Sequence, residues 1–240
     1  MNKPPLPAKP LGRKAYGSIA HLPGSRLGPA DHSVNPGQAR ICEAKLRSSL
    51  DRVIVTEKLD GSNVAIARID RDIIALNRAG YRAETSPYEV HQRFASWVAE
   101  WAAEHGPDIL HHGEVLHLEW LAMAHGTIYQ LETPATPFAV FDISQNGARL
   151  PFDRMMERAD ALYLPTVHIL SDGPPLPIPD MLELLGERGH HGAQEVAEGA
   201  VWRVERAGKF DFAAKYVRPD KIDGKYLPEL TGGEPIWLAA

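Results

Sequence analysis

Two residues whose side chains can do chemistry, Lys58 and Asp60, lie close together in the segment Lys58-Leu59-Asp60-Gly61. A lysine bonds to phosphorus only as the free amine, and with its ordinary pKa of about 10.4 only about 0.1% is deprotonated at neutral pH. A site that uses Lys58 as a nucleophile must therefore lower this pKa or remove the proton, helped by a metal ion, a cationic neighbour or a water-poor pocket. Gly61 keeps bulk away from an incoming substrate, and we expect Asp60 to fix the turn. The plain alternative is a surface turn in a hairpin.

Five more short elements follow this segment: Asn77-Arg78-Ala79-Gly80, Leu118-Glu119-Trp120-Leu121, Phe138-Ala139-Val140-Phe141-Asp142, Glu198-Gly199-Ala200-Val201 and Ala214-Lys215-Tyr216-Val217-Arg218. Together and in this order, the six elements resemble the motifs of the covalent nucleotidyltransferases, the superfamily of RNA ligases, DNA ligases and mRNA capping enzymes. The form Glu-Lys-x-Asp-Gly-Ser-Asn, residues 57–63, resembles the RNA ligase branch most. The motifs span residues 57 to 218, about two-thirds of the chain. The first 50 residues also look like the N-terminal segment of bacterial RNA-ligase-like proteins.

The resemblance implies a nucleotide site with a role for each matched residue. Lys58 would attack the α-phosphate of ATP, release pyrophosphate and carry AMP as a phosphoramidate. Glu57 would contact the adenine side, and Arg78 would hold phosphate or ribose with its planar fork of donors. Glu119 would accept from the ribose hydroxyls, and Phe141 would stack on adenine. The structural alternatives are an exposed acid at a strand end, a surface arginine in a turn, a solvent-facing strand residue and a core aromatic.

The resemblance also implies a cation and a place for the nucleic acid. Glu198 resembles the metal-associated carboxylate that contacts the nucleotide, and its hard oxygens suit Mg²⁺ or Mn²⁺. Lys215 would be catalytic, because it would neutralise charge on the α-phosphate as pyrophosphate leaves. Asn63, counted among the nucleotide-binding residues, resembles a position at which RNA ligases engage the terminal nucleotide. His125 follows the third motif and would touch the nucleic-acid end, unless it is a satisfied buried histidine.

The fifth motif departs from the family pattern. Ligases of this group often carry two lysines there, two residues apart, whereas Ala213 and Val217 flank Lys215 at that spacing. Either one lysine suffices, or Arg218 or Lys221 helps. The adjacent pairs His111-His112 and His190-His191 do not favour a structural zinc site, because neighbouring side chains diverge.

The elements that must position these residues are mostly strands. Val53–Glu57 is rich in β-branched residues and Asn63–Ile69 alternates apolar with polar, which outlines two strands joined by a tight turn. Ser86-Pro87-Tyr88-Glu89 has the form of a helix start, and Phe94, Trp97, Val98 and Trp101 follow at helical spacing, which predicts a helix over about 87–105. Further strands are predicted at Leu116–Trp120, Phe138–Ile143, Ala200–Arg206 and Phe210–Val217, the last two as a hairpin around Ala207-Gly208. Pro174–Pro179 is predicted as a loop and Met181–Arg188 as a short helix.

Antiparallel strands mixed with inserted helices favour an α+β fold. The resemblance implies a nucleotidyltransferase (adenylyltransferase) domain of antiparallel sheets with flanking helices, an ATP-grasp-like or DNA-ligase-type catalytic core. We expect a single domain over residues 1–240. Residues 1–50 would form an irregular N-terminal wrapping segment that ends in a short helix near Ile41–Ser49. Only 22 residues follow Arg218, whereas an OB-fold needs on the order of a hundred, so no C-terminal OB domain is expected.

Composition limits the class of protein. The chain has 240 residues, 44% of them hydrophobic and 24% charged, with one cysteine and no disulfide framework. No apolar run approaches the ~18 residues of a membrane span, and prolines stand where a signal peptide would be apolar, so a cytoplasmic protein is expected. The net charge is −5, but residues 1–58 hold ten basic and four acidic side chains. This positive start on a negative body suits a protein that holds an anion at one place. The alternative, which the charge count alone favours, is a solvated basic arm.

We therefore predict an ATP-dependent RNA ligase or RNA end-joining repair enzyme that uses ATP, Mg²⁺ (or Mn²⁺) and a lysyl-AMP intermediate on Lys58. AMP would pass to a 5′-phosphate, and a 3′-hydroxyl would displace it. RNA ends are the expected substrate, an end-processing repair partner is possible, and no membrane is involved. The sequence leaves the oligomeric state open. The alternative is an adenylate-binding module or subunit that needs a repair partner for sealing. A DNA ligase or a capping-type guanylyltransferase is less favoured because each appends an OB domain.

Overall fold

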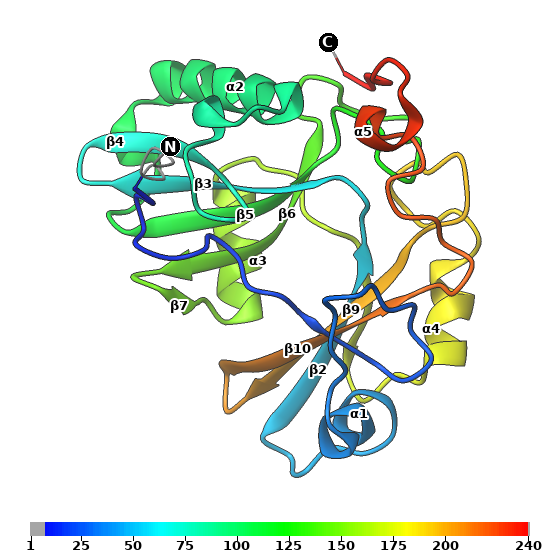
Figure 1. Cartoon of the computed structure of the whole chain (residues 1–240). Helices are drawn as coiled ribbons and strands as arrows, with labels where there is room; N and C mark the ends of the chain where they lie inside the picture. The colour runs from blue at the N-terminus through cyan, green and yellow to red at the C-terminus, as the bar shows by residue number, and fades with distance from the viewer. Residues whose placement is uncertain (1–7, 240) are drawn as a thin grey trace, which may run out of the picture.

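The computed structural model describes residues 8–239, in which two five-stranded sheets face each other (Figure 1). The first sheet, sheet A, has five strands in the spatial order β1 (Ala20–His21), β10 (Lys209–Val217), β9 (Gly199–Arg206), β2 (Asp51–Lys58) and β8 (Ile169–Gly173). Only the β1–β10 pair in it is parallel. The hairpin predicted around Ala207-Gly208 is confirmed as β9–β10.

The second sheet, sheet B, is antiparallel throughout. Its strands, in spatial order, are β4 (Asp72–Asn77), β3 (Ser62–Ile69), β5 (Glu114–Trp120), β6 (Phe138–Gln145) and β7 (Ala148–Arg149). The strands predicted at 63–69, 116–120 and 138–143 are confirmed, each within two residues of the observed bounds.

Helices cover the outer faces of both sheets. They are α1 (Pro36–Glu43), α2 (Glu89–His105), α3 (Phe152–Ala161) and α4 (Ile178–Leu185). The C-terminal segment holds the single turn α5 (Pro228–Thr231), and 3₁₀ turns lie at Ala83–Thr85 and Pro107–Ile109. The predicted helix over about 87–105 is confirmed as α2, which packs Val90, Phe94 and Val98 against sheet B. α1 and α4 pack on sheet A through Cys42, Met181 and Leu185. Among residues 8–239, none of the helices has the length and apolar character needed to cross a membrane.

Strand periodicity decides which residues face the other sheet. In β2, Val53 and Val55 pack with the α1–α4 side of sheet A, so Thr56 and Lys58 lie on the opposite, inner face. The same alternation in β9 buries Trp202 under the helices and turns Val201 toward the other sheet. The inner faces therefore carry the residues that can share a site.

Three local expectations are wrong. The outline of a hairpin at residues 53–69 fails, because β2 and β3 belong to different sheets and residues 59–61 carry the chain from one sheet to the other. The helix expected near Ile41–Ser49 is α1, which starts earlier because Asn35 caps it in a capping box with Gln38. The loop expected over Pro174–Pro179 ends early, since α4 starts at Ile178 with Pro179 in its first turn.

The N-terminal segment, residues 8–34, runs along the inner face of sheet B and then joins sheet A (Figure 1). Ala15 packs on Ala65 and Leu76 of sheet B, and the Tyr16 amide donates to the carbonyl of Arg78 over 3.4 Å. Five residues later, His21 pairs with Lys215 of β10. The segment thus crosses from one sheet to the other beside the cleft. Residues 1–7 and 240, which the predicted single domain and wrapping segment include, lie outside the described part of the chain.

Candidate active site

Lys58 is the last residue of β2 and projects between the sheets. Its Nζ lies 2.6 Å from Glu198 Oε2 and 3.2 Å from the carbonyl of Leu59. The Glu198 side chain is 8% exposed and that of Lys58 22%. Glu198 is close because Lys58 pairs with Gly199 across the ladder between β2 and β9. Sequence reasoning placed these two residues in one site, and the strand register explains why they meet.

The loop after Lys58 is held on both sides. The Asp60 amide donates to the Tyr129 hydroxyl over 2.9 Å, and the Gly61 amide donates to Glu119 Oε1 over 2.9 Å. A Cβ added to Gly61 would lie 2.4 Å from the carbonyl oxygen of Trp120. Glycine is therefore required by the close approach of β5, and not by an incoming substrate as the sequence suggested.

Charges around Lys58 favour its protonated form. Burial alone lowers the pKa of the Lys58 amine, but the carboxylates of Glu198 and Glu119 more than offset burial and raise it. Burial raises the pKa of Glu198 to about 7, although the Lys58 ammonium opposes this shift. In the ligand-free protein these charges thus favour the ammonium form of Lys58. Of the two routes to a free amine that the sequence allowed, removal of the proton is the one that this site requires.

Lys215 is the second cation of the site. It lies in β10 opposite Val201, as the predicted hairpin requires. Burial, followed by repulsion from Lys58, lowers the pKa of Lys215. Its Nζ lies 3.8 Å from Asp31 of the N-terminal segment, and Asp31 also contacts His21 Nε2 at 3.1 Å. Sequence reasoning missed Asp31 and His21, because no motif or spacing connects them to residue 215.

Two adjoining cavities meet at Lys58. The inner cavity, about 110 Å³, lies between the sheets, and the outer cavity, about 540 Å³, opens beside it. Both are lined by Tyr16, Ile19, Lys58, Asn63 and Glu119. Glu57 and Phe141 line only the inner cavity, and Arg78 and Lys215 only the outer one. With Glu198 in contact with Lys58, the structure brings together all eight residues that the sequence singled out for the site.

Tyr16 is a wall of the inner cavity for which the sequence gave no role. Its ring meets the Phe141 ring edge-on, with centroids 5.0 Å apart, and its hydroxyl donates to Asp142 Oδ2 over 3.1 Å. The guanidinium of Arg149 lies 4.5 Å from the centre of the Tyr16 ring. Phe141 is thus braced from the N-terminal segment, 125 positions away in sequence, which is why no local pattern could reveal the contact.

Glu57 lines the inner cavity, but its carboxylate is already bonded. Glu57 Oε2 accepts from the His190 amide over 2.8 Å and lies 3.0 Å from His191 Nδ1. Gly189 packs so closely that an added Cβ would lie 2.0 Å from Glu57 Oε1. The sequence did not favour a zinc site at His190-His191. The structure shows that this pair instead anchors Glu57, the residue before Lys58.

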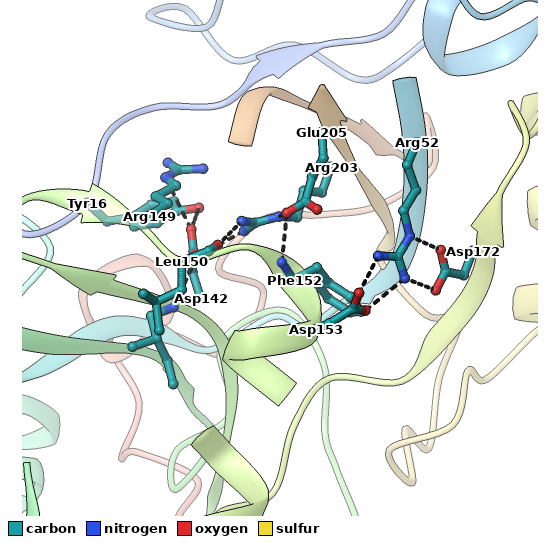
Figure 2. Close-up of polar contacts among 11 residues, drawn as sticks. Tyr16, Arg52, Asp142, Arg149, Leu150, Phe152, Asp153, Asp172, Arg203 and Glu205 are labelled. Carbon is teal, nitrogen blue, oxygen red and sulfur yellow. Dashed lines mark hydrogen bonds and ion pairs between the residues drawn. The ribbon is translucent and has the colours of Figure 1, made fainter. Parts of the chain in front are cut away.

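An ion-pair network closes the inner cavity between the sheets (Figure 2). Arg203 of β9 donates to Asp142 of β6 over 3.0 Å and to Glu205 over 2.9 Å. Arg149 of β7 also reaches Asp142, at 3.1 Å, and Glu205 accepts from the Phe152 amide over 2.7 Å. Side chains of the two sheets are thus cross-linked at the end of the cavity remote from the outer opening.

A metal ion would find few protein ligands here. Within residues 8–239 no group of three or more His, Cys, Asp or Glu side chains is arranged to hold a metal. Glu198 offers one buried carboxylate beside Lys58. This fits Mg²⁺ or Mn²⁺ held largely by substrate phosphates and water, since Mg²⁺ in phosphate sites commonly takes only one or two protein carboxylates.

Comparisons with known proteins agree with this geometry. The model of the RNA ligase family matches residues 51–217 of the chain. Among curated protein sequences, none matches. The structure is similar to form 1 of an archaeal ATP-dependent RNA ligase, with a TM-score of 0.51 and 22% identity over 84% of this chain and 48% of that one. It is also similar to an RNA ligase of Naegleria gruberi with PPi, with a TM-score of 0.53 and 18% identity over 90% of this chain and 61% of that one.

A variant of the Naegleria gruberi ligase with ATP and Mn gives a TM-score of 0.51 at 16% identity, over 82% of this chain and 59% of that one. At these identities the likeness shows a shared fold. The chain spans about half to three-fifths of the length of these structures.

Proposed function

The chain belongs to the RNA ligase family, and from this membership we propose that it is an ATP-dependent ligase that joins RNA ends through lysyl-AMP on Lys58. The observation that carries the proposal is the position of the Lys58 amine, 2.6 Å from Glu198 and at the junction of the two cavities that Lys215 and Phe141 line. Nucleophile, proton acceptor, cation and aromatic wall are the parts that adenylate transfer to an amine needs.

In the first step the Lys58 ammonium gives a proton to Glu198 Oε2, its nearest carboxylate acceptor. The free Nζ then attacks the α-phosphorus of ATP, the phosphorus–nitrogen bond forms, and the bond to the β-phosphate oxygen breaks to release pyrophosphate. Lys215 lines the outer cavity beside Lys58, where its ammonium stabilises the negative charge of the leaving group.

The nucleoside of ATP is proposed to occupy the inner cavity. Its apolar wall contains Phe141 and Val201, between which a flat base can stack. Glu119 lines both cavities and can accept from a ribose hydroxyl with the carboxylate oxygen that Gly61 leaves free. Glu57 lines the part of the inner cavity proposed for the base, and its side chain is held in place by the His190 amide.

Once the proton taken from Lys58 has passed to solvent, the Glu198 carboxylate is proposed to hold a divalent cation, Mg²⁺ or Mn²⁺, together with the phosphates of the nucleotide. A divalent cation bound there would offset phosphate charge during phosphoryl transfer.

The RNA ends are proposed to enter through the outer cavity. In the second step a 5′-phosphate oxygen attacks the lysyl-AMP phosphorus, the phosphorus–nitrogen bond breaks, and the Lys58 nitrogen takes up a proton from solvent to become an amine again. In the third step a 3′-hydroxyl attacks the activated 5′-phosphate, loses its proton and displaces AMP. Arg78 is exposed at the rim and Asn63 lies between the cavities, so both can contact the terminal nucleotides.

One observation favours a repair partner for sealing. Ala213, at the position two before Lys215, lines the inner cavity, so no second ammonium of the fifth motif reaches it. A partner that prepares the RNA ends or supplies a further cation would offset this missing lysine. Labelled protein that seals no nicked or broken RNA alone, but does so with cell extract, would support this version.

The proposal predicts that incubation with α-labelled ATP and Mg²⁺ labels the wild-type protein and that Lys58→Ala abolishes labelling, because Lys58 is the one lysine among residues 8–239 that lines both cavities. Lys209→Ala is the matched control, since Lys209 is exposed at the start of β10, and it should be labelled like the wild type. Gel autoradiography measures the outcome. An unlabelled wild type, or a labelled Lys58→Ala, would contradict the proposal.

A further inference from the structure

A buried lysine, Lys221, contacts the loop 59–61 that follows the nucleophile. Lys221 follows β10, outside the residues that the family model matches, and its side chain is only 6% exposed. Its Nζ lies 3.0 Å from Asp60 Oδ2, donates to the carbonyl of Gly126 over 2.8 Å and donates to the Thr127 hydroxyl. An ammonium has three N–H donors, and here each one has an acceptor.

The three acceptors come from two segments on either side of the site. Asp60 belongs to the loop between β2 and β3, and Gly126 and Thr127 belong to the loop after β5. Thr127 Oγ1 also donates to Asp60 Oδ2 over 3.2 Å, so Lys221, Thr127 and Asp60 form a closed triangle. Burying an ammonium is costly unless it is paired and hydrogen-bonded, and this arrangement satisfies both conditions.

The packing leaves Asp60 little room to move. A Cβ added to Gly126 would lie 2.6 Å from Asp60 Oδ2, and the Asp60 amide is held by Tyr129. Lys221 is saturated by its three partners, so it does not supply the missing second lysine of the fifth motif. Arg218 does not supply it either, because it lines neither cavity and its guanidinium instead donates to the carbonyl of Gly186 over 2.6 Å.

We infer that Lys221 is a positioning residue: by holding the Asp60 carboxylate it fixes the loop 59–61 and thereby aims the Lys58 amine for adenylate transfer. The inference rests on the proposed function. It gives a role to the segment after β10, which packs on the loop after β5 through the hydrogen bonds Tyr226 N to His125 O and Ala124 N to Ile236 O. Figure 1 shows this C-terminal segment, drawn in orange and red, beside that loop.

The test compares adenylylation kinetics of Lys221→Met, a neutral side chain of similar length, with Lys225→Met. Lys225 is the matched control because it lies on the same segment, exposed and paired with Glu195. We expect Lys221→Met to lower kcat for lysyl-AMP formation about 10- to 100-fold, the range for a misplaced reacting group, with KM for ATP within about twofold of the wild type. Lys225→Met should match the wild type in both.

A double-mutant cycle shows whether Lys221 acts through Asp60. If it does, Lys221→Met should cost no more than about twofold when Asp60 is already Asn, because the loop has then lost its anchor. A wild-type kcat in Lys221→Met, a loss confined to KM, or fully additive losses in the double variant would overturn the inference. If Lys221→Met does not fold, Thr127→Val removes the shared hydroxyl and keeps the charges. It should lower kcat several-fold at constant KM, and a wild-type rate there would overturn the inference.

Amide hydrogen exchange separates this inference from the proposed function, because it needs no activity. The Asp60 and Gly61 amides are bonded to Tyr129 and Glu119, so a loosened loop exposes them to exchange. Their exchange should be about tenfold faster or more in Lys221→Met and unchanged in Lys225→Met. Unchanged exchange in both would overturn the positioning role, whereas faster exchange in a protein that ATP never labels would support that role and reject the proposed function.

Discussion

Tyr16 lies in an irregular segment, but it supports a wall of the inner cavity. Its ring is the edge-on partner of Phe141, and its hydroxyl is bonded to the buried Asp142. An aromatic pair of this kind contributes about 0.5–1.5 kcal/mol beyond the area that it buries. A base stacked on Phe141 would therefore depend on a residue that lies outside the part of the chain matched by the family.

We predict that Tyr16→Leu weakens ATP binding about 2- to 10-fold, which is the free energy of one aromatic pair expressed as a dissociation constant. Tyr16→Phe keeps the ring and loses only the bond to Asp142, so it should bind ATP within about twofold of the wild type. Isothermal titration calorimetry measures both. Equal losses in the two variants would mean that the hydroxyl, and not the ring, supports Phe141.

The contact between His191 and Glu57 predicts a pH dependence of stability. Burial alone lowers the pKa of His191, but the hydrogen bond and charge of Glu57 outweigh burial and raise it above 6.5. A group whose pKa is raised on folding contributes stability that is present in full below 6.5 and is lost as pH rises through the folded-state pKa.

We therefore expect the difference in free energy of unfolding between the wild type and His191→Asn to shrink as pH rises above about 6.5. Urea titrations at a series of pH values measure it, and taking the difference removes the other histidines. The pKa of each of His21, His91, His117, His125 and His168 is lowered, with burial as the first cause, so these contribute with the opposite sign. A difference that grows with pH would show that Glu57 does not stabilise the imidazolium.

At the scale of elements, the short crossing between β2 and β3 leaves no room for a larger side chain at Gly61. Gly61 lies against the backbone of Trp120, and backbone cannot move aside as the end of a flexible side chain can. We predict that Gly61→Ala lowers the free energy of unfolding by about 1–3 kcal/mol, the usual cost of overpacking, and abolishes labelling by ATP. Gly17→Ala is the control for stability, because a Cβ there would meet nothing within 4 Å. Unfolding curves of equal midpoint would refute the steric argument.

The sequence predicted strands and the long helix well where one local signal dominated. α2 follows from a start signal and a helical stripe, and the β9–β10 hairpin follows from two alternating runs around Ala207-Gly208. Strands β4 and β8 and helix α3 were not predicted, because β4 and β8 are short and half-buried and α3 starts after Pro151 without a side-chain cap. The path from β2 to β3 was misjudged, since strand pattern does not encode which sheet a strand joins.

The same distinction holds for the site. Its motif residues were predictable because each belongs to a short element with a recognised order, and strand register then brings Glu198 and Lys215 to Lys58. Tyr16, Asp31 and Lys221 could not be predicted as site residues, because each reaches the site through contacts between segments far apart in sequence.

At the scale of the whole molecule, Arg203 and Arg52 each form a cluster of ion pairs, and the two clusters differ in how far they are buried (Figure 2). Arg203 is 8% exposed and joins the buried carboxylates of Asp142 and Glu205. Arg52 is 32% exposed, and its partners Asp153 and Asp172 are more open to solvent. Removing one member of a buried pair leaves an uncompensated charge, whereas an exposed pair is screened by water.

We predict that Arg203→Met lowers the free energy of unfolding by about 3–5 kcal/mol and that Arg52→Met lowers it by no more than about 1 kcal/mol per ion pair lost. Chemical denaturation measures both. Arg203→Met combined with Glu205→Gln should recover part of the loss, because Glu205 loses its ion-pair partner in Arg203→Met, whereas Asp142 keeps Arg149. Similar effects of the two arginine variants would show that burial does not set the strength of these clusters.

The three-residue crossing after Lys58 has a mechanical consequence. Within residues 8–239, Leu59–Gly61 is the shorter of the two covalent links between strands of the two sheets, and the other runs from β7 through α3 to β8. If the sheets move apart to admit a nucleotide and together to enclose it, residues 59–61 are the hinge of that movement. The parts of the two sheets that carry Phe141 and Lys215 then move furthest. Lys58, which lies at the hinge, stays nearly stationary while the cavities around it widen and narrow.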